Sequence, residues 1–281
     1  MTDKLLILAA GASSRMKASK GSAGLTSEDI KLANTRSKSL IPGPDGYRPV
    51  LDHLIRRAKA AGITEIFLIV GANLVDFQEF YGKQMKRNSF ENIHINYAIQ
   101  HIPEGRSKPL GTADAVYQAI TQYPELQQQH FLVCNSDNLY SRRAIETLRH
   151  SDSPAALMAY DRDTLEFPDE RIARFALLQS DEHGYLSEII EKPEQDRVER
   201  FRGQDGKFRV SMNIFSFDGR IMFPYFRDCP VDPERDEKEI PTALLNACQD
   251  VKKACHCYPI SEHVPDLTSK EDIELFRKYL K

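Results

Sequence analysis

The sequence lacks the features that mark secreted and membrane-spanning chains. No apolar run reaches the roughly 18 residues that a membrane helix needs. Nothing at the N-terminus resembles a signal peptide, because Asp3 and Lys4 precede only a few apolar residues. The five cysteines are an odd number in a chain of 281 residues, which favours reduced thiols over a disulfide framework. We therefore expect a cytoplasmic protein that does not act on membranes.

Charge of one sign is also scarce. The formal net charge is −3 and the isoelectric point is near 6.3, so the chain has no global basic field for nucleic acid. The sequence shows no local basic patch, internal repeat or low-complexity segment. At this length a chain can bury a sizeable core, and we expect one domain, residues 1–281, with small-molecule ligands. The formation of a homo-oligomer stays open.

Two common phosphate-binding motifs, the P-loop and the dinucleotide fingerprint, are absent as well. In their place, the apolar stretch 5–9 leads into a turn of small residues that ends at Arg15. Around Ala10, Gly11 and Ala12, backbone N–H groups are able to approach an anion, and Arg15 can bind oxygens bidentately. The alternative is an ordinary strand-to-helix turn with a solvated arginine.

Short apolar runs alternate with helical patterns along the first half of the chain. Their near-continuous hydrophobicity predicts strands that are covered on both faces. An apolar repeat over 50–58 has helical spacing and stops at Gly62, which can cap a helix end. This alternation predicts an α/β fold with three layers around a mostly parallel, Rossmann-like mixed sheet. The expected strands are 5–9, 66–70, 93–99, 131–134 and 155–159.

The second half changes this rhythm. Runs 175–178 and 185–190 flank the turn-rich stretch 180–184, which predicts a hairpin and adds a small antiparallel part to the sheet. The remaining expected elements are strands at 210–217 and 254–258, a helical pattern around 244–248 and a closing helix at 270–279.

Polar residues follow several of the expected strands. Gln100 ends a strand and has an amide that can pair with a base edge, while Gly111 and Thr112 open a helix. A plain N-cap with an incidental Gln is the alternative. Asp137 lies beyond the carboxyl end of strand 131–134, where open α/β sheets bind ligands, and this placement suits Mg²⁺. Asp137 as a turn or N-cap residue is the alternative there.

Three further motifs are weak when each is taken alone. Glu191-Lys192-Pro193 closes a strand, and its charged side chains could meet sugar hydroxyls and a phosphate or simply decorate the surface. Asp266 is either a turn acid or a second metal ligand. Cys255-His256-Cys257 lacks the usual C-x-x-C spacing of a metal site, and its alternation fits a strand with both thiols on one face.

Taken in chain order, these motifs resemble those of the sugar-1-phosphate nucleotidyltransferases, also called nucleotide-sugar pyrophosphorylases. The resemblance covers nearly the whole chain. The stretch 8–16 is similar to the family's signature loop, 111–115 to its base-binding turn, 136–138 to its metal motif and 191–193 to its sugar and phosphate motif. Lys38 resembles the lysine that follows the loop, Asn213 matches the place where the family has an Asn-containing strand near the sugar, and Asp266 resembles the second metal-binding aspartate.

The resemblance implies transfer of a nucleotidyl group from a nucleoside triphosphate to a sugar-1-phosphate, with release of pyrophosphate. It implies that Asp137 and Asp266 bind Mg²⁺, that about 1–150 binds the nucleotide and that about 151–281 binds the sugar phosphate. Gln100 with Gly111 and Thr112 favours UTP or dTTP. The implied catalytic residues are Arg15, Lys38 and Lys192, and the implied substrate-binding residues are Ala10, Gly11, Ala12, Gln100, Gly111, Thr112, Asn138, Glu191 and Asn213.

The chain departs from the family pattern in several places. Segment 17–36 separates Arg15 from Lys38 by more than is usual, and we expect it to be a nucleotide-dependent lid. Ser136 replaces a glycine, and 174–176 replaces a Tyr-Gly-Val-like stretch. Two other functions stay open: a nucleotidyltransferase that acts on a non-sugar phosphate, and a non-catalytic relative that binds sugar nucleotides. A glycosyltransferase is disfavoured, because the central Asn135-Ser136-Asp137 has only one acid.

Overall fold

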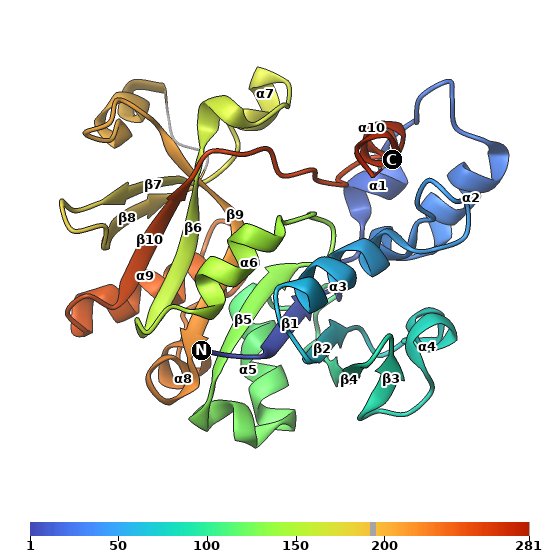
Figure 1. Ribbon diagram of the computed structural model, residues 1–281, viewed down its shortest axis with the longest axis horizontal. Helices are drawn as coiled ribbons and strands as arrows, with labels where there is room; N and C mark the ends of the chain where they lie inside the picture. The colour runs from blue at the N-terminus through green and yellow to red at the C-terminus, as the bar shows by residue number, and fades with distance from the viewer. Residues whose placement is uncertain (192–194, 281) are drawn as a thin grey trace.

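A ten-stranded mixed sheet forms the centre of the computed structural model, which describes residues 1–191 and 195–280 (Figure 1). The strands follow the order β10-β6-β9-β5-β1-β2-β4-β3, and β7 and β8 form a hairpin beside β9. Their bounds are β1 Lys4–Leu8, β2 Glu65–Val70, β3 Asn88–Phe90, β4 Ile93–Ile99, β5 His130–Asn135, β6 Ala155–Asp161, β7 Leu177–Ser180, β8 Leu186–Ile190, β9 Arg209–Asp218 and β10 Cys255–Ile260.

Most strands of the sheet run in one direction. Strand β1 is parallel to β2 and β5, β2 is parallel to β4, and β10 is parallel to β6. Strand β9 is antiparallel to β5 and β6, and the β7–β8 hairpin adds the expected antiparallel part. The predicted α/β class with a mostly parallel mixed sheet is therefore confirmed.

Helices cover both faces of the sheet and bury one apolar cluster on each (Figure 1). Helices α3 and α6 lie over one face, and α5, α8 and α9 lie over the other. The α-helices are α1 Ser14–Ala18, α2 Ser27–Thr35, α3 Val50–Ala60, α4 Val75–Tyr81, α5 Thr112–Gln122, α6 Arg142–Arg149, α7 Asp169–Ile172, α8 Gly219–Arg227, α9 Ile240–Asp250 and α10 Asp272–Tyr279. Short 3₁₀ turns are η1 Lys38–Leu40, η2 Pro124–Gln128, η3 Arg162–Thr164 and η4 Gln195–Phe201.

Segment 17–36 contains α2, whose first turn is closed by a capping box between Thr26 and Asp29. One expected strand boundary needs correction. The strand expected from residue 175 begins at Leu177, because the amide of Phe175 donates to the carbonyl of Ile172 at 3.1 Å and extends the turn after α7. None of the helices in the described ranges is long and apolar enough to cross a membrane.

Candidate functional site

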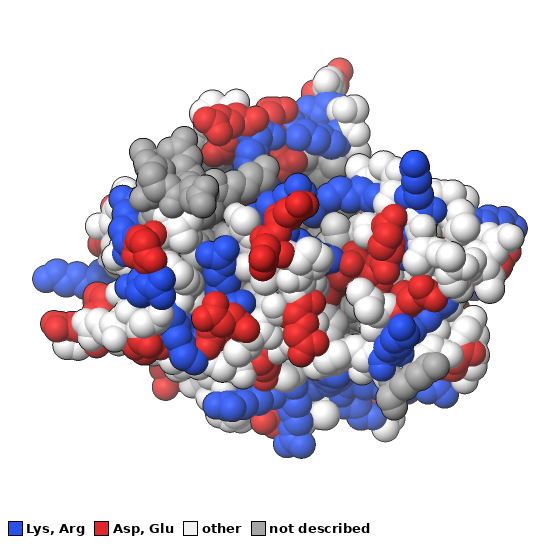
Figure 2. Space-filling model, turned by 90° about the horizontal axis from the view of Figure 1, so that it is seen from above, with Lys and Arg blue, Asp and Glu red and all other residues white. Residues whose placement is uncertain are grey.

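Three chain segments meet at the carboxyl ends of the central strands. The amide of Ser136, after β5, donates to the carbonyl of Leu8 in β1 at 3.2 Å. The amide of Leu139 donates to Pro265 at 2.9 Å, which joins the loop after β5 to the segment before α10. In Figure 1 the segment before α10 crosses the upper part of the molecule, above β1 and β5, and Figure 2, which views the molecule from above, shows acidic and basic side chains interspersed on that face.

The two acids predicted to bind metal are brought together at this junction. Residues 138 and 266 form an isolated antiparallel bridge. Asp137 is only 8% exposed, and the Asp266 side chain is 12% exposed. Burial raises the pKa of Asp266 above its usual value, and the nearby Asp137 carboxylate raises it further, although Arg171 and Lys38 act in the opposite direction.

This pair of carboxylates fits a divalent cation. Hard oxygen donors are what Mg²⁺ prefers, and a bound cation would offset the repulsion between the two acids. No group of three or more His, Cys, Asp and Glu side chains gathers within the described ranges. Asp137 and Asp266 would therefore be the protein ligands, and substrate oxygens or water would complete the coordination.

Lys38 lies directly beside these acids. Its ammonium forms an ion pair with the Asp137 carboxylate, and its amide donates to the Ser13 hydroxyl at 3.3 Å. Ser13 precedes α1 in the left-handed conformation, with φ at 55°. The long segment between Arg15 and Lys38 therefore returns the lysine to the turn that bears the arginine.

The small-residue turn is open to solvent. Gly11 and Ala12 are exposed, Ala10 is half-buried, and Arg15 is exposed on α1. A Cβ built on Gly11 meets nothing within 4 Å, so the space above its backbone is free. The turn can therefore admit a ligand close to its main chain.

The predicted base-binding turn has internal partners of its own. Gln100 is 4% exposed, and its amide nitrogen donates to the carbonyl of Gly111 at 2.9 Å and to Asp114 at 3.1 Å. The Thr112 hydroxyl does not cap α5 and instead accepts from the amide of Ile240 at 3.1 Å. A Cβ on Gly111 would lie 2.3 Å from the carbonyl oxygen of Lys238. The turn is thus shaped by the segment that precedes α9.

Asn213 lies in a bulge of β9. Its φ of 57° is left-handed, its side chain is exposed, and the pairing of β9 with β6 shifts register here. The buried Tyr140 hydroxyl holds the bulge by donating to the carbonyls of Met212 and Asn213 at 2.8 and 2.9 Å. Bulges of this kind re-aim a side chain next to a site. Asn138, close by in sequence to Tyr140, is 5% exposed.

Glu191 forms an ion pair that sequence reasoning missed. Its partner is Arg235, which also pairs with Glu239 at 2.9 Å. Lys192, the third predicted cation, lies outside the described residues. Arg235 lies in the connection between α8 and α9, and no motif was recognised around it, so only the folded chain reveals that it pairs with Glu191.

Segment 17–36 is docked on α10. Arg277 pairs with Asp29 at 2.6 Å, and Ala33 is fully buried in the core. Lys270 is 2% exposed, and its ammonium donates to three carbonyls at the end of α1 and beyond. These are the carbonyls of Met16, Lys17 and Ser19, at 2.8, 3.0 and 2.6 Å.

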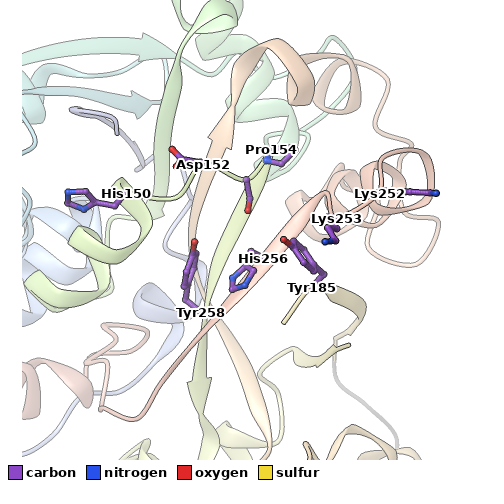
Figure 3. Close-up of a pocket in the computed structure, with 9 residues that line it drawn as sticks. His150, Asp152, Pro154, Tyr185, Lys252, Lys253, His256 and Tyr258 are labelled. Carbon is purple, nitrogen blue, oxygen red and sulfur yellow. The ribbon is translucent and has the colours of Figure 1, made fainter. Parts of the chain in front are cut away.

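The Cys-His-Cys sequence takes no part in this site. Cys255 and Cys257 are buried on one face of β10, and burial raises the pKa of Cys257 to about 12, so the thiols pack as apolar groups. His256, on the other face, lines a cavity of about 490 Å³ at the amino ends of β6 and β10 (Figure 3). None of the predicted site residues is among its lining side chains.

A model of the family described as "Nucleotidyl transferase" matches residues 22–262, which is most of the chain. The chain belongs to this nucleotidyl transferase family. Membership confirms the resemblance seen in the motifs and agrees with the mixed α/β sheet.

Two kinds of curated protein are similar to the chain. A glucose-1-phosphate adenylyltransferase of Aliivibrio fischeri is 25% identical over 218 residues, which are 77% of this chain and 49% of that protein. The bifunctional protein GlmU of Staphylococcus haemolyticus is 26% identical over 245 residues, 87% of this chain and 45% of that protein. The chain thus spans about half the length of the curated relatives it matches.

Proposed function

We propose that this chain transfers a nucleotidyl group from a nucleoside triphosphate to a sugar-1-phosphate, releasing pyrophosphate and forming a nucleotide sugar. One observation carries the proposal: Asp137, Asp266 and Lys38 converge at the carboxyl ends of the strands, beside the turn that leads to Arg15. These groups come from distant parts of the sequence. Together, Lys38 and a cation held by the two acids would neutralise negative charge on the transferring phosphates.

The reaction needs alignment more than proton transfer. The attacking sugar phosphate has a second pKa of about 6, so at neutral pH it is mostly a dianion and requires no general base. Its oxygen attacks the α-phosphorus of the triphosphate, and pyrophosphate departs with its electron pair. The backbone around Gly11 and the Arg15 guanidinium bind the departing pyrophosphate, while Lys38 exchanges Asp137 for a phosphate oxygen. Lys192 is assigned to the sugar phosphate.

Asp137 and Asp266 would hold Mg²⁺. When bound, the ion supplies charge neutralisation at the phosphates and a template that orients them. The chain's own residues prepare the site, because the backbone bridge between residues 138 and 266 fixes the spacing of the two acids before any ligand arrives.

We assign the nucleotide to about residues 1–150 and the sugar phosphate to about 151–281 of a single domain. Gln100 and Gly111, whose side chain and carbonyl are 2.9 Å apart, are placed against the base, and UTP or dTTP is the proposed donor. The side-chain nitrogen of Gln100 already donates to Gly111 and Asp114. The side-chain oxygen of Gln100 and the backbone of the turn would therefore make the contacts with the base. Asn138, Glu191 and Asn213 are assigned to the sugar.

A pyrophosphate-release screen tests the proposal. The five common triphosphates are crossed with a panel of sugar-1-phosphates, and with alcohol phosphates to test a non-sugar acceptor. We expect release that needs both a triphosphate and a sugar-1-phosphate, with UTP or dTTP preferred. A preference for ATP, which would agree with the adenylyl transfer in the name of the Aliivibrio fischeri relative, would correct the base assignment alone. Binding of nucleotide sugars without any release would instead indicate a non-catalytic relative.

A further inference from the structure

Arg171 is the one charged side chain of α7 that reaches both the acid predicted to bind metal and the helix behind it. One terminal nitrogen of its guanidinium lies 2.9 Å from the Asp266 carboxylate and donates to the Asp266 carbonyl at 3.0 Å. The other donates to the Asp272 carboxylate at 2.6 Å. Arg171 thus contacts both the main-chain carbonyl and the side-chain carboxylate of Asp266.

The guanidinium is itself held in place. Asp272, at the start of α10, binds it from one side, and the Phe167 ring lies 4.4 Å from its central carbon. A planar guanidinium that is stacked on a ring and bonded to two carboxylates has little rotamer freedom left. Lys38, by contrast, has a flexible side chain, and in the proposed reaction it leaves Asp137 to bind a phosphate oxygen.

Asp272 also binds the backbone of the residues that follow Asp266. Its second carboxylate oxygen accepts from the amides of Thr268 and Ser269 at 2.9 and 2.7 Å. The Thr268 hydroxyl in turn donates to both oxygens of Asp266 at 3.1 Å. The Asp266 carboxylate therefore has its orientation set by Thr268 and Arg171, both of which depend on Asp272.

We propose that Arg171 is a positioning residue for the metal site, which fixes the Asp266 carboxylate in the orientation that binds a divalent cation. This inference rests on the proposed function, because it takes Asp266 as a metal ligand. Groups that orient metal ligands from behind typically contribute 10- to 100-fold to metal affinity.

The sign of the effect separates positioning from plain electrostatics. Arg171 carries a positive charge close to the site, so at a pH where both acids are fully ionised in the wild type and the variant, charge alone predicts that its removal strengthens cation binding. Loss of orientation predicts that its removal weakens cation binding. A purely structural ion pair between α7 and α10 predicts no change in affinity for a variant that stays folded.

The test is a Mn²⁺ titration of the full chain with no nucleotide present. Electron paramagnetic resonance measures the free Mn²⁺ at each step of the titration. We expect Arg171→Met to weaken Mn²⁺ binding by about 10-fold or more, in the range typical of such orienting partners. Arg174→Met removes an exposed arginine from the same segment and should leave the affinity unchanged. Unchanged or tighter binding by Arg171→Met would overturn the proposal.

Two further variants keep the result decisive. Asp266→Asn should abolish Mn²⁺ binding at this site; if it does not, the metal assignment of the proposed function fails. Loss in Asp266→Asn with wild-type affinity in Arg171→Met removes only the role of Arg171. Asp272→Asn is the alternative variant if Arg171→Met does not fold, because it weakens the hold on the guanidinium with little change of shape. We expect it to weaken Mn²⁺ binding several-fold. Wild-type affinity in Asp272→Asn would contradict the proposal.

Discussion

The backbone amide of Leu267 donates a hydrogen bond to the carbonyl oxygen of Asp137 at 2.9 Å. This bond joins the loop after β5 to the segment before α10, so the two metal-binding candidates are neighbours through their main chains. Their side chains lie in one largely buried site, close enough for the Asp137 carboxylate to raise the pKa of Asp266. The arrangement explains why acids so far apart in sequence can serve one chemistry.

Gly111→Ala should destabilise the protein. The residue has φ 115° and ψ −177°, a region open essentially to glycine alone, and its Cβ would meet the Lys238 carbonyl oxygen at 2.3 Å. We expect the free energy of unfolding to fall by about 1–3 kcal/mol or more, as measured by urea denaturation.

Gly11→Ala is the matched control for that change. Its Cβ has free space around it, so the stability should stay within about 0.5 kcal/mol of wild type. Turnover should nevertheless drop, because the added methyl group fills the space in which a phosphate approaches the backbone. Equal loss of stability in both variants would contradict the distinction between the two glycines.

Tyr140→Phe should loosen the bulge that presents Asn213. The variant leaves the carbonyls of Met212 and Asn213 without their donor, at a cost of about 1–3 kcal/mol in unfolding free energy. If Asn213 contacts the sugar, the KM for sugar-1-phosphate should rise more than the KM for triphosphate. Tyr160→Phe is the control, because that buried hydroxyl has no hydrogen-bond partner within the described ranges, and its loss should be nearly neutral.

Lys270→Met should destabilise the helical turn α1, which carries Arg15. The buried ammonium satisfies three carbonyls at the end of α1, and methionine keeps its volume while removing all three donors. We expect a loss of about 1–3 kcal/mol in thermal or urea unfolding, and a raised KM for triphosphate. Lys17→Met, which changes an exposed lysine of the same turn, should alter stability little, and an equal loss there would argue against the capping role.

Docking of α2 on α10 should weaken in acid. The hydrogen bond from Arg277 lowers the pKa of Asp29 from 3.8 to about 2. A carboxyl whose pKa is lower in the folded state stabilises the fold above its unfolded pKa, and this contribution is lost as the pH falls from about 4 toward 2. Asp29→Asn should therefore be less stable than wild type at pH 6, with a difference that shrinks below pH 4. A difference independent of pH would contradict the ion pair.

The sequence predicts the central strands well because most of their residues are apolar and buried. Run 93–99 coincides with β4, and 155–159 lies within β6. Helix α2 is not among the elements expected from the sequence, because its buried side includes little more than Ala33 and Asp29 and gives no apolar stripe. Its docking depends on Arg277, far along the chain.

The predicted site residues were found as motifs, but their partners were not. Arg171 and Arg235 stand among many surface charges in the sequence, and only the fold brings them to Asp266 and Glu191. Gly111 and Thr112 were recognised, yet their contacts with Lys238 and Ile240 lie across two loops that no local pattern joins. Pairings between distant segments are what local residue patterns leave undetermined.

Mg²⁺-dependent pyrophosphate release by wild type, Asp137→Asn and Asp266→Asn tests the central claim most directly. The account predicts release by the wild type with at least one pairing of triphosphate and sugar-1-phosphate. It predicts a loss of at least about 100-fold in each variant, with unchanged circular dichroism, because each substitution removes a carboxylate that would hold Mg²⁺ against the transferring phosphates. No release by the folded wild type across the full panel, or undiminished turnover in both variants, would contradict it.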